Sequence, residues 1–213
     1  MKNNSKKSKR TINTKEKFKT VLIMCEGEKT EVYYFEDFRD DLKKSGIRGI
    51  NIEVTGTGYN TVSLVNEAIK EKNNGSYHSV WAVFDKDDFN QFNGAIQIAN
   101  ANNINVAYSN EAFELWYLLH FNYHDTAMSR KDYEPKLTGK IGRKYEKNSE
   151  GMYATIKDKQ NNAIRNAKNL LNEYKPGNDK NFDPMKITEG FNPANNNPST
   201  TVHLLVEELN TYI

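Results

Sequence analysis

TVLIMCEGE (residues 20–28) and SVWAVFDKDD (residues 79–88) are the two stretches of sequence that decide the fold. Each is a short, continuous apolar run that leads directly into acidic residues. An apolar run without alternation is typical of a strand buried on both faces, as in a parallel sheet covered by helices. The acidic residues then follow the carboxyl ends of two strands, which is where open α/β sheets bind their ligands.

The segments around these two strands alternate between strand-like and helix-like patterns. Apolar spacing predicts two more strands and a helix after each of the four strands. This order predicts an α/β fold in which a mostly parallel sheet carries helices on both faces. If the strand order is the common 2-1-3-4, the two quoted strands are neighbours. The further strands are expected over residues 50–54 and 104–108, and the helices over 29–44, 62–72, 89–101 and 112–119.

The pattern changes near residue 122, so the chain divides into three parts. We expect a basic tail at residues 1–19 and an α/β core at residues 20–121. Residues 122–213 are expected to form a basic helical insertion and C-terminal helices, which pack on the core to give a single domain. Within this last part, residues 152–174 are predicted to form one long helix.

The formal net charge of +2 hides an uneven distribution of charge along the chain. Residues 1–19 carry eight Lys or Arg and one acid, and residues 130–147 carry seven Lys or Arg and three acids. Such segments often contact nucleic acid, and the interleaved Tyr133 and Tyr145 would add base stacking. A solvated surface or a docking surface for a protein would have the same composition. The predicted nucleic-acid contacts are Arg130, Lys131, Lys140, Arg143 and Lys144.

Composition and motifs exclude several classes of protein. No apolar run exceeds five residues, whereas a membrane span needs about 20. A single cysteine excludes an internal disulfide framework, and the four histidines are too scattered for a structural zinc site. The sequence contains neither the phosphate-binding loop motif G-x-x-x-x-G-K-[ST] nor the dinucleotide-binding motif G-x-G-x-x-G. We therefore expect a cytoplasmic protein that does not contact the membrane.

The acidic residues at the strand ends predict a metal site. Asp85 and Asp87 are two positions apart in an extended segment, so their side chains point the same way, and Glu26 would face them from the neighbouring strand. Carboxylates held this close repel one another unless a cation neutralises them. Mg²⁺ (or Mn²⁺) suits such a set, completes its shell with water and phosphate oxygens, and promotes phosphoryl transfer. Solvated acids in a turn or an ion pair are the alternative. The nearby Glu28 and Glu31 could support the site, but we expect them to lie in a solvated first helical turn.

The wider set of motifs resembles a known family. Glu26-Gly27 with Asp85-x-Asp87 resembles the signature of the Toprim domain. The sequence over residues 20–210 resembles the RloB family in four blocks: EGEKTE with YYF (residues 26–31 and 33–35), FDKDD (84–88), SNEAFELWYLLHF (109–121) and NPST (197–200). The resemblance implies a Toprim-like fold and a role in bacterial abortive-infection or restriction-associated defence.

The same resemblance implies a metal-dependent nuclease that is regulated by an ABC- or AAA-like ATPase. Carried over by position, Glu26 would be a general acid/base or a metal ligand, and Asp85 and Asp87 would be metal ligands. Glu114 is a further catalytic candidate, although it could instead form a local cap or ion pair. Glu111 is a poor candidate, because it stands where the family has proline.

Other hypotheses stay open on the sequence alone. The chain could be a non-catalytic module that binds nucleic acid or a protein partner of the same defence system, or a protein that senses or transfers small phosphate compounds. The choice between DNA and RNA and the formation of a homo-oligomer are also open. We expect Trp116 and His120, which lie in an apolar context, to be core residues.

Overall fold

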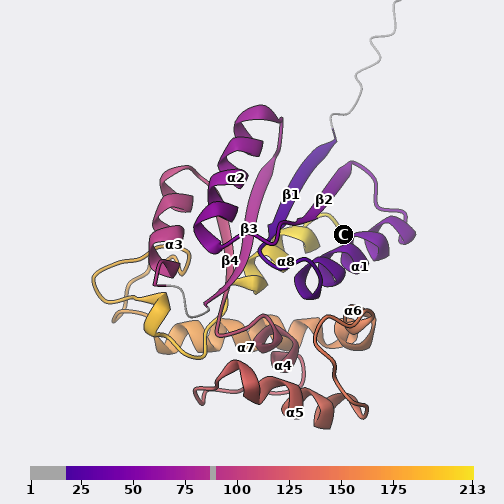
Figure 1. Cartoon of the computed structure of the whole chain (residues 1–213), viewed down its shortest axis with the longest axis vertical. Coiled ribbons are helices and arrows are strands. Elements are labelled where there is room, and N and C mark those ends of the chain that lie inside the picture. Colours follow the sequence, from indigo (N-terminus) through magenta and orange to yellow (C-terminus); the bar gives the residue numbers. More distant parts are fainter. Residues whose placement is uncertain (1–17, 87–89) are drawn as a thin grey trace, which may run out of the picture.

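The structure, a computed structural model, describes residues 18–86 and 90–213. A four-stranded, all-parallel sheet forms the centre of this part of the chain (Figure 1). Its strands are β1 (Lys19–Cys25), β2 (Ile50–Gly56), β3 (Ser79–Lys86) and β4 (Asn105–Asn110). The strands lie in the order β2-β1-β3-β4. This order confirms the prediction and the α/β class, and it is consistent with a Toprim-like fold.

Strand β1 is buried on both faces, as its continuous apolar sequence predicts. Val21, Ile23 and Cys25 pack on one side of the sheet, and Leu22 and Met24 pack on the other, because successive side chains of a strand alternate. These side chains are at most 4% exposed. The sheet therefore separates two hydrophobic cores.

Helices cover both faces of the sheet (Figure 1). The face that carries Leu22 is covered by α2 (Thr61–Asn74) and α3 (Phe92–Ala101). The opposite face is covered by α1 (Thr30–Lys44) and α8 (Val202–Asn210). This arrangement places the start of α1 beside the carboxyl ends of the strands.

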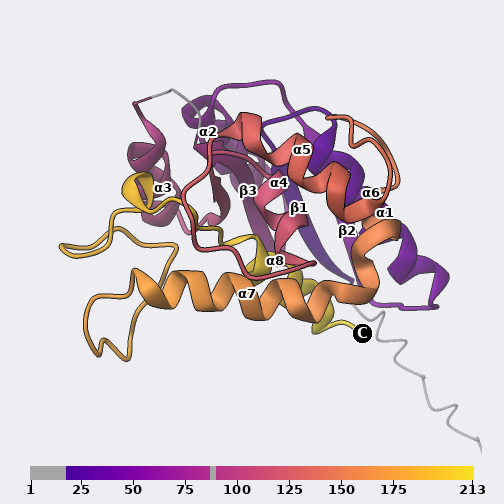
Figure 2. The ribbon, with the colours of Figure 1, turned by 90° about the horizontal axis from the view of Figure 1, so that it is seen from below.

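The helices of residues 122–213 join the core on the α1 side of the sheet, whereas Ile187 and Ala194 pack on the opposite side. Side chains from α5 (Arg130–Ile141), α6 (Met152–Ile156) and α7 (Gln160–Glu173) belong to the same hydrophobic cluster as β1 and α1, together with α4 (Glu114–Leu119). Figure 2 shows α7 running along the underside of the molecule, where it packs on α4 and α8. None of the helices in the described ranges has the length and apolar character needed to cross a membrane.

The predicted single helix over residues 152–174 is wrong, because a 3-10 turn at Lys157–Lys159 separates α6 from α7. Tyr153 on α6 packs against Tyr34 and Phe38 of α1. Helix α7 instead packs on α4 and α8. One straight helix could not reach both surfaces, so the chain changes direction between them.

The segment after α7 returns to the edge of the sheet beside β4. Thr200 forms an antiparallel bridge with Ser109, and the N–H of Thr201 donates to the carbonyl of Tyr108 at 2.9 Å. Two of the motif blocks, around Asn110 and over residues 197–200, therefore lie side by side although they are far apart in the sequence.

Candidate active site

A cleft of about 310 Å³ lies where β1 and β3 end. Glu26 follows β1 directly, Asp85 lies near the end of β3, and Glu31 comes from the first turn of α1. Arg130, at the start of α5, and Lys147, in the loop after α5, line the same cleft. The cleft thus combines three carboxylates with two cations.

The carboxylate of Glu26 is oriented by two donors from different elements. Its Oε1 accepts a hydrogen bond from the hydroxyl of Thr61, the first residue of α2, at 2.8 Å. Its Oε2 accepts from the backbone N–H of Asp85 at 3.3 Å. The pairing of β1 with β3 brings these groups together, because the N–H of Glu26 in turn donates to the carbonyl of Val83 at 2.9 Å. Glu26 and Asp85 therefore converge as the sequence predicts.

Asp85 presents a buried carboxylate oxygen to this site. Its Oδ1 is inaccessible to solvent and has no hydrogen-bond partner among the described residues. Burial raises the pKa of Asp85 well above its usual value, and repulsion from Glu31 and Glu114 raises it further. A hydrogen bond from the backbone of Phe113 and the positive charge of Lys147 act in the opposite direction. The pKa is still raised, so the site holds an acidic group whose charged form the protein itself does not favour.

Glu31 is a site residue that the sequence analysis placed wrongly in a solvated turn. Its side chain is only 7% exposed. Burial raises the pKa of Glu31 from 4.5 to about 7, with further contributions from Glu114 and Glu26. A sequence signal existed, because Glu31 lies on the same helical face as Phe35, Phe38 and Leu42 of α1, which all face the core.

Gly27 makes room for the Glu31 carboxylate. A Cβ atom built at position 27 would overlap with Oε2 of Glu31. The side chain of any larger residue at this position would displace the carboxylate from the cleft. This close approach gives a physical reason for glycine directly after Glu26.

Glu114 lies beside the cleft rather than in its lining. The side chain is 4% exposed, and its Oε1 accepts a hydrogen bond from the hydroxyl of Tyr145 at 3.0 Å. Its charge contributes to the raised pKa values of both Glu31 and Asp85. Glu114 therefore belongs to the same electrostatic cluster, held in place by a residue from the loop after α5.

The third predicted ligand, Asp87, lies outside the described residues. Within residues 18–86 and 90–213, no three acidic, histidine or cysteine side chains stand close enough together to hold a metal ion by themselves. The oxygen donors still fit Mg²⁺, which takes one or two carboxylates and fills the rest of its shell with water and phosphate oxygens. Asp85 and Glu26, which both line the cleft and are joined by the hydrogen bond from the Asp85 backbone N–H to Oε2 of Glu26, offer such a pair.

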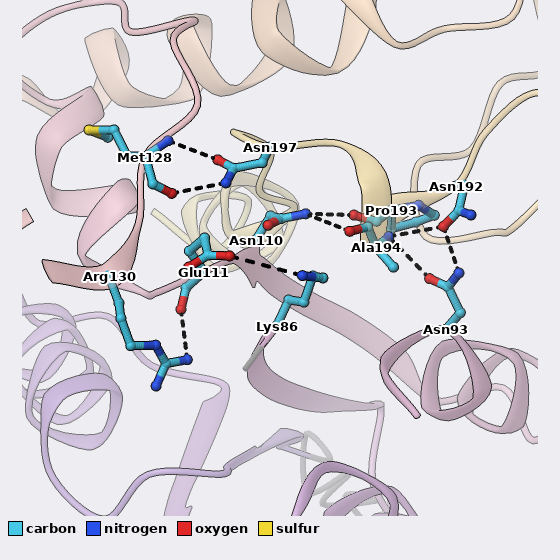
Figure 3. Close-up of polar contacts among 10 residues, drawn as sticks. All are labelled: Lys86, Asn93, Asn110, Glu111, Met128, Arg130, Asn192, Pro193, Ala194 and Asn197. Carbon is cyan, nitrogen blue, oxygen red and sulfur yellow. Dashed lines mark hydrogen bonds and ion pairs between the residues drawn. The ribbon is translucent and has the colours of Figure 1, made fainter. Parts of the chain in front are cut away.

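The predicted nucleic-acid contacts divide into two groups. Arg130 lines the cleft, where its Nη2 donates to the backbone carbonyl of Glu111 at 3.1 Å (Figure 3). The side chain of Glu111 turns instead toward Lys86, with 3.9 Å between Nζ and Oε1, and it does not line the cleft. The remaining four predicted contacts are exposed but lie outside the cleft lining; these are Lys131, Lys140, Arg143 and Lys144.

The expectation that Tyr133 and Tyr145 stack on bases is wrong, because both side chains are buried, at 1% and 2% exposure. Tyr133 and Leu137 form the inward stripe by which α5 packs on the core. The hydroxyl of Tyr145 is engaged with Glu114. The basic segment is therefore a charged surface without an aromatic platform from these two residues.

The asparagines of the motif blocks have structural roles. The side-chain amide of Asn110 donates to the carbonyl of Pro193 at 2.8 Å (Figure 3). The side chain of Asn197 accepts from the backbone N–H of Met128 at 3.3 Å and donates to the carbonyl of the same residue at 2.9 Å (Figure 3). Trp116 and His120 are both 0% exposed, which confirms them as core residues. Burial lowers the pKa of His120 to about 4.

These features define a parallel α/β protein with a carboxylate cleft at the ends of its central strands. A family model described as "RloB-like protein" matches residues 21–209. The chain therefore belongs to the RloB-like family, as its motifs indicate. No curated protein and no solved structure gives a significant match to the chain.

Proposed function

We propose that the protein is a Mg²⁺-dependent nuclease that hydrolyses phosphodiester bonds of DNA or RNA in the cleft of Glu26, Glu31 and Asp85. The observation that carries this proposal is the buried, unpartnered Oδ1 of Asp85 in a cleft shared with two other carboxylates. Carboxylates crowded in this way strongly favour a bound cation. The carboxyl ends of parallel strands are where open α/β sheets bind ligands, and a cation held there could promote phosphoryl transfer.

In this proposal Glu26 and Asp85 hold the metal ion, and Asp87 is a further candidate ligand. When bound, Mg²⁺ supplies polarisation of the phosphodiester and activation of water. Thr61 and the backbone N–H of Asp85 orient the carboxylate of Glu26. Glu31, with a pKa of about 7, exchanges its carboxyl proton near neutral pH, as a general acid or base should.

Membership of the RloB-like family supports a biological role for this activity. We propose that the protein is an effector of an antiviral abortive-infection system and that an ABC- or AAA-like ATPase controls it. The proposal predicts a gene for such an ATPase beside this one, and co-expression of the two proteins followed by affinity purification tests the partnership. Recovery of the chain without that ATPase under mild salt would contradict it.

The nuclease proposal is tested by cleavage assays with DNA, tRNA and other RNA, in Mg²⁺ or Mn²⁺ and in EDTA. We expect metal-dependent cleavage by the wild type and a loss of roughly 10²-fold or more in Asp85→Asn and Glu26→Gln, because each change removes a charged ligand. Glu53→Gln, an exposed carboxylate on β2, is the matched control and should cleave normally.

Equal cleavage by the wild type and both cleft variants would contradict the site. The alternative of a non-catalytic binding module predicts a different pattern. In that case the wild type binds nucleic acid without cleaving it, and binding survives loss of the carboxylates but fails when the cations of residues 130–147 are neutralised.

A further inference from the structure

Lys147 differs from the other lysines of the basic segment 130–147 in its position. It lines the carboxylate cleft, and its charge opposes the raised pKa values of both Glu31 and Asp85. Its ammonium group forms no ion pair with any described residue. By contrast, Lys144 in the same loop pairs with Glu146 at 3.1 Å.

Two hydrogen bonds fix the loop on either side of Lys147. The hydroxyl of Tyr145 donates to Glu114 on α4 at 3.0 Å. The hydroxyl of Thr30, at the start of α1, donates to Oδ1 of Asn148 at 3.1 Å. Lys147 lies between these anchors, which attach to the elements that carry two carboxylates of the cluster. The ammonium group is therefore directed at the cleft by a loop that is tied down at both ends.

The backbone next to Lys147 also has an unusual conformation. Asn148 has a φ of 66°, which lies in the left-handed region that residues other than glycine adopt at a cost. Asn148 is the residue that accepts the hydrogen bond from Thr30. The anchor therefore holds the chain in a turn that brings Lys147 back toward the cleft.

The charges in the cleft indicate what this cation binds. Glu26, Glu31 and Asp85 line the cleft, Glu114 lies beside it, and a substrate phosphodiester would add a further negative charge. A bound Mg²⁺ would offset part of this charge. Arg130 and Lys147 are the cations of the cleft lining that face the remainder. Arg130 already donates to the carbonyl of Glu111, which leaves Lys147 as the cation with its donors uncommitted among the described residues.

We propose that Lys147 contacts a non-bridging oxygen of the scissile phosphate and stabilises the negative charge that develops there. This inference rests on the proposed nuclease function and adds a catalytic residue to it. In hydrolysis the water oxygen bonds to phosphorus, and the bond to the leaving sugar oxygen breaks. That oxygen departs with the electron pair and takes up a proton. Lys147 keeps its own proton throughout and acts by hydrogen bonding and charge.

The test compares Lys147→Ala and Lys147→Arg with Lys70→Ala, which removes an exposed lysine on α2 that pairs with Glu67. Mn²⁺ affinity is measured by calorimetry. Affinity for a fluorescein-labelled single-stranded oligonucleotide is measured by anisotropy in Ca²⁺ over a range of salt concentrations. Cleavage rates are measured at saturating substrate.

We expect opposite effects of Lys147→Ala on the two ligands. Mn²⁺ should bind roughly fivefold more tightly, because the variant lacks a positive charge that repels the metal ion from the carboxylates. The oligonucleotide should bind more weakly, with the slope of log affinity against log salt reduced by about 0.7, which corresponds to one phosphate contact on a single strand. The cleavage rate should fall roughly 10²-fold. Lys147→Arg should restore most of the binding, and Lys70→Ala should match the wild type.

Two outcomes would overturn the assignment of Lys147. One is that Lys147→Ala behaves like Lys70→Ala in all three measurements. The other is that Lys147→Ala loses Mn²⁺ and oligonucleotide affinity together and melts at a lower temperature, as a purely structural charge partner would. A wild type that neither binds Mn²⁺ nor cleaves would instead overturn the nuclease function, and the salt slope would still report on the phosphate contact alone.

Discussion

Glu31 shows how a single residue can link stability to function. When the pKa of a carboxyl group is higher in the folded protein than in the unfolded chain, ionisation of that group at high pH destabilises the folded state. For Glu31 the two values are about 7 and 4.5. Its ionisation therefore costs folding stability as the pH rises from about 4.5 to 7, in the absence of a cation that would compensate the charge.

The first prediction concerns Glu31→Gln, which removes this ionisation. In EDTA, we expect the variant to be more stable than the wild type at pH 8 by roughly 2–3 kcal/mol. The difference should nearly vanish at pH 4, where both side chains are neutral. Urea unfolding at several pH values measures the effect. A stability difference that does not change with pH would contradict the raised pKa.

At the scale of elements, the apolar spacing of the sequence and the capping residues predict the helices and strands near the site. Helix α2 begins at Thr61, one residue before the predicted start, because Oδ1 of Asn60 accepts the N–H of Ser63 at 3.0 Å and caps the helix. Strand order and strand burial also follow from the sequence. The position of α5 does not, because its apolar stripe consists only of Tyr133 and Leu137 among buried residues. The entry to α5 is held instead by a distant asparagine, Asn197.

The second prediction tests this attachment of α5. Asn197→Ala removes both bonds to the backbone of Met128 and leaves those backbone groups without these partners. We expect a loss of roughly 1–3 kcal/mol in the free energy of unfolding, measured in urea. Asn195→Ala, a change at an exposed position on the same loop, is the control and should change stability by less than about 0.5 kcal/mol.

At the scale of the whole molecule, the proposed cation site would lower the stability of the protein without its cation, because it holds carboxylates close together. The third prediction is that Asp85→Asn melts at a higher temperature than the wild type in EDTA at neutral pH, by roughly 2–8 °C, because it removes repulsion between buried carboxylates. The wild type should gain about 2.7 kcal/mol when Mn²⁺ reaches 100 times its dissociation constant. The variant should show little gain, and thermal melts with and without Mn²⁺ test both statements.

A variant that is destabilised in EDTA, or that gains as much from Mn²⁺ as the wild type, would show that Asp85 has a structural role. Glu53→Gln again serves as the control, since it is a carboxylate on the exposed edge of β2. It should leave both the melting temperature in EDTA and the gain from Mn²⁺ unchanged.

The sequence by itself determined the α/β class, the strand order and the meeting of Glu26 with Asp85. These features follow from short-range patterns and from the rule that parallel strands bring their carboxyl ends to one edge of the sheet. Family membership could likewise be inferred from the motif blocks, and the match over residues 21–209 confirms it.

Only the tertiary structure decided which other residues join the site. Glu31 enters it because α1 turns an acidic residue toward the core, and Lys147 enters it because hydrogen bonds to α4 and α1 tie down its loop. The same packing buries Tyr133 and Tyr145, which the sequence alone presents as base-stacking residues. The helical spacing of Glu31 with the buried face of α1 signals its burial, but the position of the Lys147 loop depends on contacts such as Thr30 with Asn148, 118 residues apart, about which local periodicity carries no information.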